Sequence, residues 1–135
     1  MKRRDFLTFT AAALVAPAAL QAATEYSPGL VQKALAEGKT VFLDFKASWC
    51  STCARQERVI NVLKSENPAY AANITFVNVD WDKYGRSDLA KSLNIPRRST
   101  LVVLKGDKEL GRIVAGTGKD QIKALMDTAL AAAMA

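Results

Sequence analysis

The fold of this chain is decided by residues 41–53, which read VFLDFKASWCSTC. Residues 40–46 are rich in β-branched and aromatic side chains, a composition typical of a strand that is covered on both faces. A helical pattern begins at Cys50 and continues to about Lys64, with residues 59, 60, 62 and 63 expected in the core and residues 55–58 on the solvent-exposed face. The stretch therefore predicts a buried strand that leads through a short turn into a helix, with two cysteines at the start of that helix.

Strand and helix patterns alternate on both sides of this stretch. Helices are expected from Leu30 until Gly38, over residues 86–93 and from residue 119 onward. Strands are expected over residues 74–79, 100–104 and 109–115, and a tight turn joins the last two as a hairpin. These elements predict an α/β fold in which a central mixed sheet of four to five strands carries helices on both faces.

Length and composition indicate one globular domain. The 135 residues suit a single core, and the chain is 50% hydrophobic and 24% charged, unlike a disordered chain. It contains no histidine. A histidine base, a histidine metal ligand and a Ser-His or Cys-His nucleophile pair are therefore excluded, and with them most hydrolases and zinc enzymes.

The first 22 residues have the order of an export signal. A basic start at residues 2–4 is followed by an uncharged, alanine-rich stretch and a small-residue exit. The pair Arg3-Arg4 resembles the twin-arginine export signal, and a general secretory signal is the alternative. We expect cleavage after Ala22 and a periplasmic mature chain, with an uncleaved, membrane-anchored form as the second option.

Part of the positive charge belongs to this signal. Removal of residues 1–22 leaves 113 residues and lowers the net charge from +6 to +4. The one basic doublet of the remainder, Arg97-Arg98, has no aromatic residues interleaved with it, so we expect no nucleic-acid partner. The mature chain is expected to consist of an entry segment (23–29), one domain (30–130) and a frayed tail (131–135).

Cys50 and Cys53 are the only cysteines, and their spacing favours redox chemistry. On the first turn of a helix both sulfurs come within bonding reach, and the helix dipole and backbone N–H groups favour the Cys50 thiolate. We therefore predict Cys50 as the nucleophile. Cys53, one turn further and more buried, is predicted as the resolving thiol, with Ser51 and Thr52 between the two.

Two other roles of the cysteine pair stay open. A static disulfide would close a loop of only four residues, and it would therefore stabilise the fold little. A soft-metal or iron–sulfur site would need ligands from a second copy or an exogenous thiol, because two thiolates fall short of the usual four. Redox activity is the reading that the pair favours.

Three residues near the pair are candidate supporting groups. Asp44 is a carboxylate in an otherwise apolar strand, where burial of its ionised form is costly. It is either a water-accessible residue or an acid with a raised pKa that accepts the Cys53 proton. Lys46 shares its face of the strand, and an expected option is a pair with Asp44, which would hold the acid ionised and weaken its role as a proton acceptor. Trp49 is expected to cap the core and shield the sulfurs.

Residues 30–130 resemble thioredoxin. The resemblance rests on the strand at 41–45, the segment at 47–53, residues 77–80, and the strand at 100–104 with its hairpin and final helix. It implies the thioredoxin fold, thiol–disulfide oxidoreductase activity without a redox cofactor, and protein thiols and disulfides as partners. It also places Asp44 at the buried acid position of the family.

The sequence departs from the thioredoxin pattern in the loop before residue 100. The family carries a cis-proline there, which packs against the cysteine pair, whereas this chain has Ser99 and places Pro96 three residues earlier. We expect a trans or rearranged loop, since a non-proline cis bond costs about 2.5–4 kcal/mol. Pro96, Ser99 and Thr100 form the expected partner-docking loop, and the loss of the proline favours the metal alternative.

Other departures bear on the direction of electron flow. Ser51-Thr52 replaces the Gly-Pro of general thioredoxins and the Pro-His of oxidising relatives, and without a histidine beside the thiolate a reducing role is favoured. Phe76 replaces a buried lysine that often partners the acid, and Lys46 replaces a frequent tryptophan. We expect a monomer that receives its electrons from a membrane donor.

Overall fold

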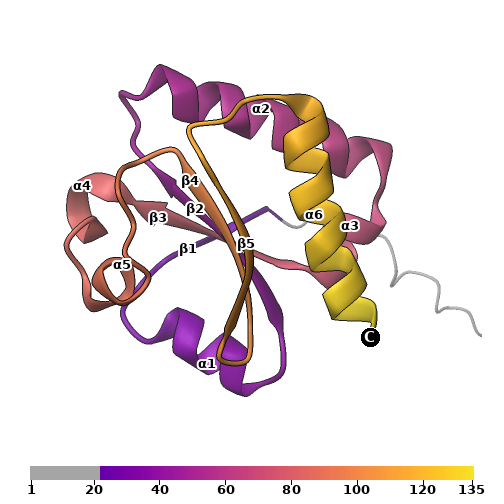
Figure 1. Cartoon of the computed structure of the whole chain (residues 1–135), viewed down its shortest axis with the longest axis horizontal. Coiled ribbons are helices and arrows are strands. Elements are labelled where there is room, and N and C mark those ends of the chain that lie inside the picture. Colours follow the sequence, from indigo (N-terminus) through magenta and orange to yellow (C-terminus); the bar gives the residue numbers. More distant parts are fainter. Residues whose placement is uncertain (1–21) are drawn as a thin grey trace, which may run out of the picture.

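The computed structural model describes residues 22–135, which form a five-stranded sheet with helices on both faces (Figure 1). The export signal predicted for residues 1–22 therefore lies, apart from Ala22, outside the described residues. In chain order the elements are β1 (Thr24–Glu25), α1 (Leu30–Ala36), β2 (Thr40–Lys46), α2 (Ser51–Glu66), α3 (Ala69–Asn73), β3 (Thr75–Asp80), α4 (Trp81–Tyr84), α5 (Asp88–Ser92), β4 (Thr100–Lys105), β5 (Lys108–Val114) and α6 (Lys119–Met134). The predicted α/β architecture is confirmed.

β2 is the central strand of the sheet, whose strand order is β1-β3-β2-β4-β5. β3 runs parallel to both β2 and β1, whereas β4 runs antiparallel to β2 and to β5. Gly106, with a φ of +60°, supplies the left-handed residue in the turn of the β4–β5 hairpin. Because β2 has a strand on each side and helices on each face, its apolar sequence is buried almost throughout.

Side chains of β2 alternate between two apolar cores. Val41, Leu43 and Phe45 pack on the face covered by α1 and α5. Phe42 packs on the opposite face with α2, α3 and α6. Asp44 shares the alternation of Phe42 and therefore lies on the face covered by α2. The buried acid and the helix that starts at the cysteines thus meet on the same side of the sheet.

Three short elements are not indicated by the sequence pattern. β1 has 2 residues, α3 has 5 and α4 has 4, and none is long enough to show a period. β1 lies within the expected entry segment and pairs with β3, which adds the fifth strand to the sheet. The folded unit therefore begins before residue 30.

The helices differ from the predictions in two further respects. α6 continues to Met134, so residues 131–134, which were expected to fray, are helical. On α2, Gln56 is fully buried and Val62 is exposed, the reverse of the faces that charge patterning predicts. Helical periodicity explains this result, because the buried stripe of α2 recurs every three or four residues. It consists of Cys53, Gln56, Ile60 and Leu63.

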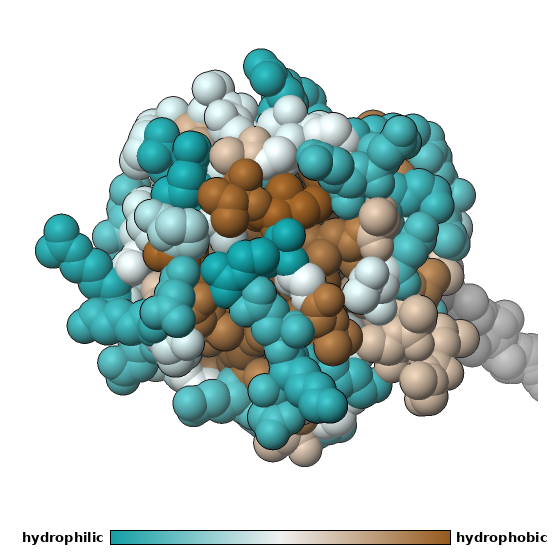
Figure 2. Space-filling view, in the orientation of Figure 1, coloured by the Kyte–Doolittle hydropathy of each residue, from teal (hydrophilic) through white to brown (hydrophobic). Residues whose placement is uncertain are grey.

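The surface around β5 is partly apolar. β5 is an edge strand, and its Leu110 and Ile113 are only partly buried. Hydrophobic residues gather near the centre of the face shown in Figure 2, with hydrophilic residues around them. Among residues 22–135, no helix has both the length and the apolar character that crossing a membrane requires.

Candidate functional site

The two cysteines lie where β2 passes into α2. The Cys50 N–H donates to the Ala47 carbonyl at 3.2 Å and closes the connecting turn. Cys50 is the N-cap of α2, and its Sγ accepts a hydrogen bond from the Cys53 backbone N–H at 3.1 Å. The cap therefore gives the Cys50 sulfur one of the free donors at the helix start. Between the cysteines, Ser51 is exposed and Thr52 is half-buried.

A serine hydroxyl lies between the two sulfurs. Ser99 Oγ is 3.2 Å from Cys50 Sγ and 3.1 Å from Cys53 Sγ, and Ser99 is fully buried. Residues 22–135 contain no cis peptide bond, and Ser99 has a φ of +66°. The loop is therefore trans and rearranged, as predicted, and it places a hydroxyl group against the cysteine pair.

The surroundings separate the pKa values of the two thiols. Burial raises the pKa of Cys50, but hydrogen bonds with the Cys53 thiol, the Ser99 hydroxyl, the Cys53 N–H and Arg98 lower that pKa to about 7. Burial and the hydrogen bond with Cys50 raise the pKa of Cys53. Both thiols are free and buried, with Cys53 more buried than Cys50. The site therefore favours a thiolate on Cys50 and a thiol on Cys53.

Asp44 is a buried acid, with only 5% of its surface exposed. Burial raises its pKa to about 7, against the opposing effect of Lys46. Its Oδ1 has no hydrogen-bond partner among the described residues. Asp44 borders a cavity of about 330 Å³, which Glu57 and Lys64 also line. Asp44 is therefore a buried acid with a raised pKa that faces a cavity.

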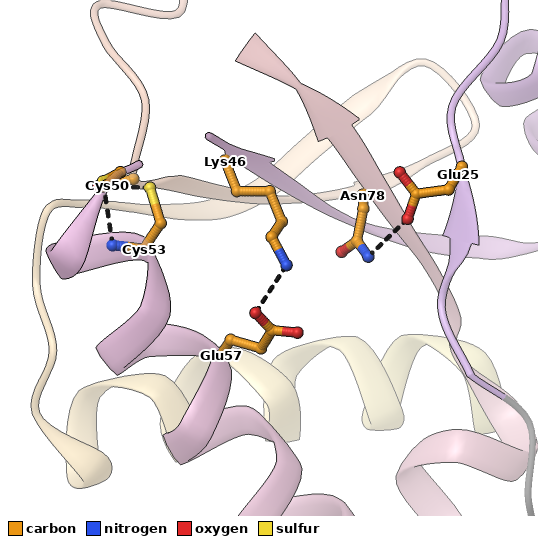
Figure 3. A network of polar contacts seen from close by, with 7 residues as sticks. Glu25, Lys46, Cys50, Cys53, Glu57 and Asn78 are labelled. Carbon is orange, nitrogen blue, oxygen red and sulfur yellow. Dashed lines mark hydrogen bonds and ion pairs between the residues drawn. The ribbon is translucent and has the colours of Figure 1, made fainter. Parts of the chain in front are cut away.

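Lys46 pairs with Glu57 and not with Asp44, so the expected Asp44–Lys46 pair is wrong. Lys46 Nζ lies 2.7 Å from Glu57 Oε1 (Figure 3). Glu57 remains half-exposed on α2, and an ion pair there avoids most of the desolvation that a pair with the buried Asp44 would require. Glu57 also lines a second cavity, which Cys50 and Cys53 border. The Lys46–Glu57 pair therefore lies at the boundary between the acid and the dithiol.

Lys64 brings a second positive charge toward the acid from α2. Its Nζ lies 4.0 Å from the centroid of the Phe76 ring. Burial lowers the pKa of Lys64, and the charges of Asp44 and Glu57 oppose that shift. The resemblance leads one to expect a lysine at the position of Phe76 itself. Here the cation comes from a different element, which the sequence does not signal.

Trp49 lies at the rim of the site and does not cap the core, so that prediction is wrong. It is 59% exposed, and its Nε1 donates to both carboxylate oxygens of Asp82 at 3.1 Å. The hydrophobic neighbour of the cysteines is Trp81 instead. The Arg98 guanidinium lies over the Trp49 ring, with Cζ 4.7 Å from its centroid. Arg98 thus adds a positive charge to the rim beside Cys50.

The loop expected to dock partners is only partly accessible. Pro96 is exposed, whereas Ser99 and Thr100 are fully buried. The Ser99 N–H donates to the Phe45 carbonyl at 2.7 Å, and the Ser99 carbonyl accepts from the Ala115 N–H at 2.8 Å. Because both backbone groups are already paired, Ser99 has no free backbone to offer to an extended partner chain. The structure thus leaves Pro96 as the exposed residue of the expected docking loop, while Ser99 and Thr100 are buried.

Gln56 holds the Ser99 loop from α2, and sequence reasoning missed it. Its Nε2 donates to the Ser99 carbonyl at 3.0 Å and to the Gly116 carbonyl at 2.9 Å. The charge pattern of the sequence predicts that Gln56 lies on the solvent-exposed face of α2. One sequence feature does indicate the burial of Gln56. It lies three residues after Cys53, on the buried stripe of the same helix.

Replacement of Gln56 by leucine is expected to lower the free energy of unfolding by about 1–3 kcal/mol, because two carbonyls lose their amide donor inside the fold. Urea denaturation measures this loss. The matched control is Gln32→Leu on the exposed face of α1, which is expected to change stability by less than about 0.5 kcal/mol. Equal losses in the free energy of unfolding for the two substitutions would contradict a stabilising role of the Gln56 hydrogen bonds to the Ser99 and Gly116 carbonyls.

Fold and site together define a class of protein. A central strand of a mixed sheet leads into a helix, the first cysteine of a Cys-x-x-Cys pair caps that helix, and a buried acid lies in the strand. The family model for thioredoxin matches residues 20–128. The chain belongs to the thioredoxin family.

Individual relatives agree with this family. The thioredoxin H-type of Fagopyrum esculentum is 36% identical over 91 residues, which are 67% of this chain and 72% of that protein. Thioredoxin H2-1 of Oryza sativa is 32% identical over 90 residues, which are 67% of this chain but 60% of the rice protein. Among solved structures, Trxlp from Edwardsiella tarda gives a TM-score of 0.65 at 25% identity and covers 76% of this chain and 98% of its own.

Proposed function

We propose that this chain is a thiol–disulfide oxidoreductase that reduces disulfides of partner proteins. The observation that carries the proposal is the cap at Cys50, whose sulfur accepts the Cys53 N–H at 3.1 Å. Against the effect of burial, the Cys53 thiol, the Ser99 hydroxyl, this N–H and Arg98 lower the pKa of Cys50 to about 7, while burial and Cys50 raise the pKa of Cys53. A thiolate beside a second thiol at neutral pH is what stepwise disulfide exchange requires.

The exchange has two steps, and the two electrons of the dithiol pass to the substrate. The Cys50 thiolate attacks one sulfur of the partner disulfide, which forms a mixed disulfide and releases the other sulfur as a thiolate. Cys53 then gives up its proton and attacks Cys50 Sγ, which releases the second substrate sulfur. The products are a Cys50–Cys53 disulfide and two reduced substrate sulfurs, one of which carries the proton that leaves Cys53.

Asp44 accepts the Cys53 proton in this scheme and later gives it up to the released thiolate. Its pKa of about 7 suits an acid and base that works at neutral pH. Glu57 lines both the cavity of Asp44 and the cavity bordered by Cys53. The proton therefore passes through water beside the Lys46–Glu57 pair. This position gives Lys46 and Glu57 a supporting role.

Electron flow toward partner disulfides is supported by the pKa of Cys50. A value of about 7 is that of a reducing thioredoxin, whereas strongly oxidising relatives reach about 3.5. Strong stabilisation of the thiolate stabilises the reduced form and makes the disulfide an oxidant. The moderate stabilisation at Cys50 therefore supports a reductant.

Reduction of insulin disulfides, with dithiothreitol as the electron source, tests the proposed function. The purified protein is expected to accelerate the precipitation of the insulin B chain, followed as turbidity. The control is the double variant Cys50→Ser/Cys53→Ser, which keeps the fold and lacks the dithiol. A wild-type rate no greater than that of the double variant would refute the proposal.

The rate at which iodoacetamide alkylates Cys50 is expected to rise with pH through a midpoint near 7, because only the thiolate reacts. Cys53 is expected to react at higher pH, since its pKa is raised. Mass analysis of the two alkylated cysteines separates their pH profiles. Equal midpoints, or a lower midpoint for Cys53, would contradict the assignment of Cys50 as the nucleophile.

The compartment is the second part of the proposal. The basic pair and alanine-rich stretch of residues 1–22 support export to the periplasm, where a membrane electron donor would reduce the Cys50–Cys53 disulfide of the monomer. Fractionation of a bacterial host is expected to yield a periplasmic chain that begins at Ala23. An Arg3→Lys/Arg4→Lys variant is expected to remain in the cytoplasm. Unchanged export of that variant would point to the general secretory route.

The soft-metal or iron–sulfur alternative can be tested on the same protein. Within residues 22–135, no group of three or more His, Cys, Asp or Glu side chains could hold a metal ion. A metal on Cys50 and Cys53 would therefore need ligands from another molecule. Stoichiometric metal or a visible chromophore after anaerobic purification would favour this alternative over the reductase.

A further inference from the structure

We propose that Ser99 is a catalytic residue of the dithiol site, whose single hydroxyl proton stabilises the Cys50 thiolate first and the Cys53 thiolate second. The inference deepens the proposed function and rests on it for the second step. Ser99 Oγ makes two contacts with the pair, at 3.2 Å from Cys50 Sγ and at 3.1 Å from Cys53 Sγ.

The hydrogen-bonding capacity of a hydroxyl limits how Ser99 can interact with both sulfurs. It offers one proton and two acceptor lone pairs. With Cys50 as the thiolate and Cys53 as the thiol, the hydroxyl donates to Cys50, and its oxygen faces the Cys53 thiol, which also forms a hydrogen bond with Cys50. The Ser99 O–H thereby joins the Cys53 thiol, the Cys53 backbone N–H and Arg98 as a donor to the Cys50 thiolate. Both contacts of the hydroxyl are thereby used in the dithiol state.

The backbone holds this hydroxyl in place. The Ser99 N–H donates to Phe45, and the Ser99 carbonyl accepts from both Ala115 and Gln56. The residue has a φ of +66° and no exposed surface. Since its backbone groups are all paired within the chain, the side chain is the part of Ser99 that takes part in chemistry. Rotation about the C–O bond is enough to turn the proton from one sulfur to the other.

The second step uses that rotation. After Cys50 has attacked the substrate, its sulfur belongs to the mixed disulfide and carries no charge. The Ser99 O–H then turns to the sulfur of Cys53 and donates to the thiolate that forms there as the Cys53 proton leaves toward Asp44. Cys53 attacks Cys50 Sγ, the S–S bond to the substrate breaks, and the substrate sulfur departs with the electron pair. Ser99 itself neither gains nor loses a proton.

Charged groups around the cysteine pair also influence the electrostatics of the site. Besides the two thiols, the groups that line the adjoining cavity or affect the pKa of Cys50 or of Asp44 come from the sheet, from α2 and from the loop before β4. They are Glu25, Asp44, Lys46, Glu57, Lys64, Asp80 and Arg98. A substitution at Ser99 leaves all of them in place.

Two variants remove the hydroxyl in different ways. Ser99→Ala keeps the Cβ, and Ser99→Gly also frees the backbone, which glycine allows at a positive φ. Both are expected to move the midpoint of Cys50 alkylation to higher pH, to slow alkylation at pH 7 about fivefold, and to prolong the mixed disulfide by a similar factor. The matched control is Ser48→Ala, an exposed hydroxyl two residues before Cys50, which is expected to change neither quantity.

The outcomes separate this inference from the proposed function. An unchanged alkylation profile in both Ser99 variants overturns the inference, even if the wild type reduces disulfides. A change in Ser99→Ala that is absent from Ser99→Gly also overturns it, because the effect then comes from the backbone. A shifted profile in a chain that reduces no disulfide supports the thiolate contact and overturns the second step together with the proposed function.

Discussion

Replacement of Cys50 by serine is expected to lower disulfide reduction to the uncatalysed rate, a loss of at least about 10³-fold, because a serine hydroxyl is not ionised at neutral pH and does not attack a disulfide. Replacement of Cys53 by serine is expected to preserve the first step and block the second. The geometry explains the difference, since Cys50 caps α2 and its sulfur is the one that receives the Cys53 N–H.

Non-reducing electrophoresis and mass spectrometry measure these two effects. The Cys53→Ser variant is expected to accumulate mixed disulfides with its substrate, and the Cys50→Ser variant to accumulate none. The double variant is the control for non-specific exchange. Mixed disulfides in Cys50→Ser and none in Cys53→Ser would reverse the roles of the two thiols.

Replacement of Asp44 by asparagine is expected to stabilise the fold at pH 8 by up to about 4 kcal/mol, because the native state no longer buries a charge. The pKa of Asp44 is about 7 in the folded chain and ordinarily 3.8. Between these two values the native state binds more protons than the unfolded state. The stability of the wild type is therefore fully present below about pH 4 and falls as the pH rises through 7.

Urea denaturation at pH 4 and pH 8 tests this prediction. The advantage of Asp44→Asn is expected at pH 8 and is expected to be small at pH 4. The control is Asp107→Asn, an exposed carboxylate in the β4–β5 turn, which leaves the pH dependence as it is. An advantage of equal size at both pH values would show that packing, and not ionisation, is responsible.

The same Asp44 variant is expected to prolong the mixed disulfide, because the Cys53 proton loses its acceptor. General acid–base groups contribute on the order of 10²-fold or more to the rate of the step that they assist. The stability gain and the slower second step share one cause, the carboxylate that is buried beside the dithiol.

The fold was predictable from sequence because its strongest elements are long and regular. β2 is apolar from Val41 to Phe45 except at Asp44, the β4–β5 turn contains glycine, and α2 starts at a residue that caps it. The position of Cys50 as the cap of α2 followed from the same local logic, since a helix start offers donors to the side chain at its cap. These features depend on neighbours within a few residues.

The rest of the site depends on contacts between distant segments. Lys46 forms an ion pair with Glu57 on α2, and Trp49 contacts Arg98 and Asp82. Gln56 donates a hydrogen bond to the loop before β4. Local sequence patterns do not predict these contacts, because burial and distance in the folded chain decide which residues meet. The contacts of Ser99 were not predictable for the same reason. The sequence indicated that a proline is missing at this position, but not that the Ser99 hydroxyl lies between the two sulfurs.

Titration of the protein in glutathione redox buffers, with alkylation of free thiols and mass analysis, tests most directly whether Cys50 and Cys53 form a reducing couple. We predict a single two-electron transition between the dithiol and the Cys50–Cys53 disulfide, with a potential near −270 mV, that of a reducing thioredoxin. A potential near −120 mV would mean that the protein donates disulfides. Thiols that never pair in any buffer would contradict the redox function itself.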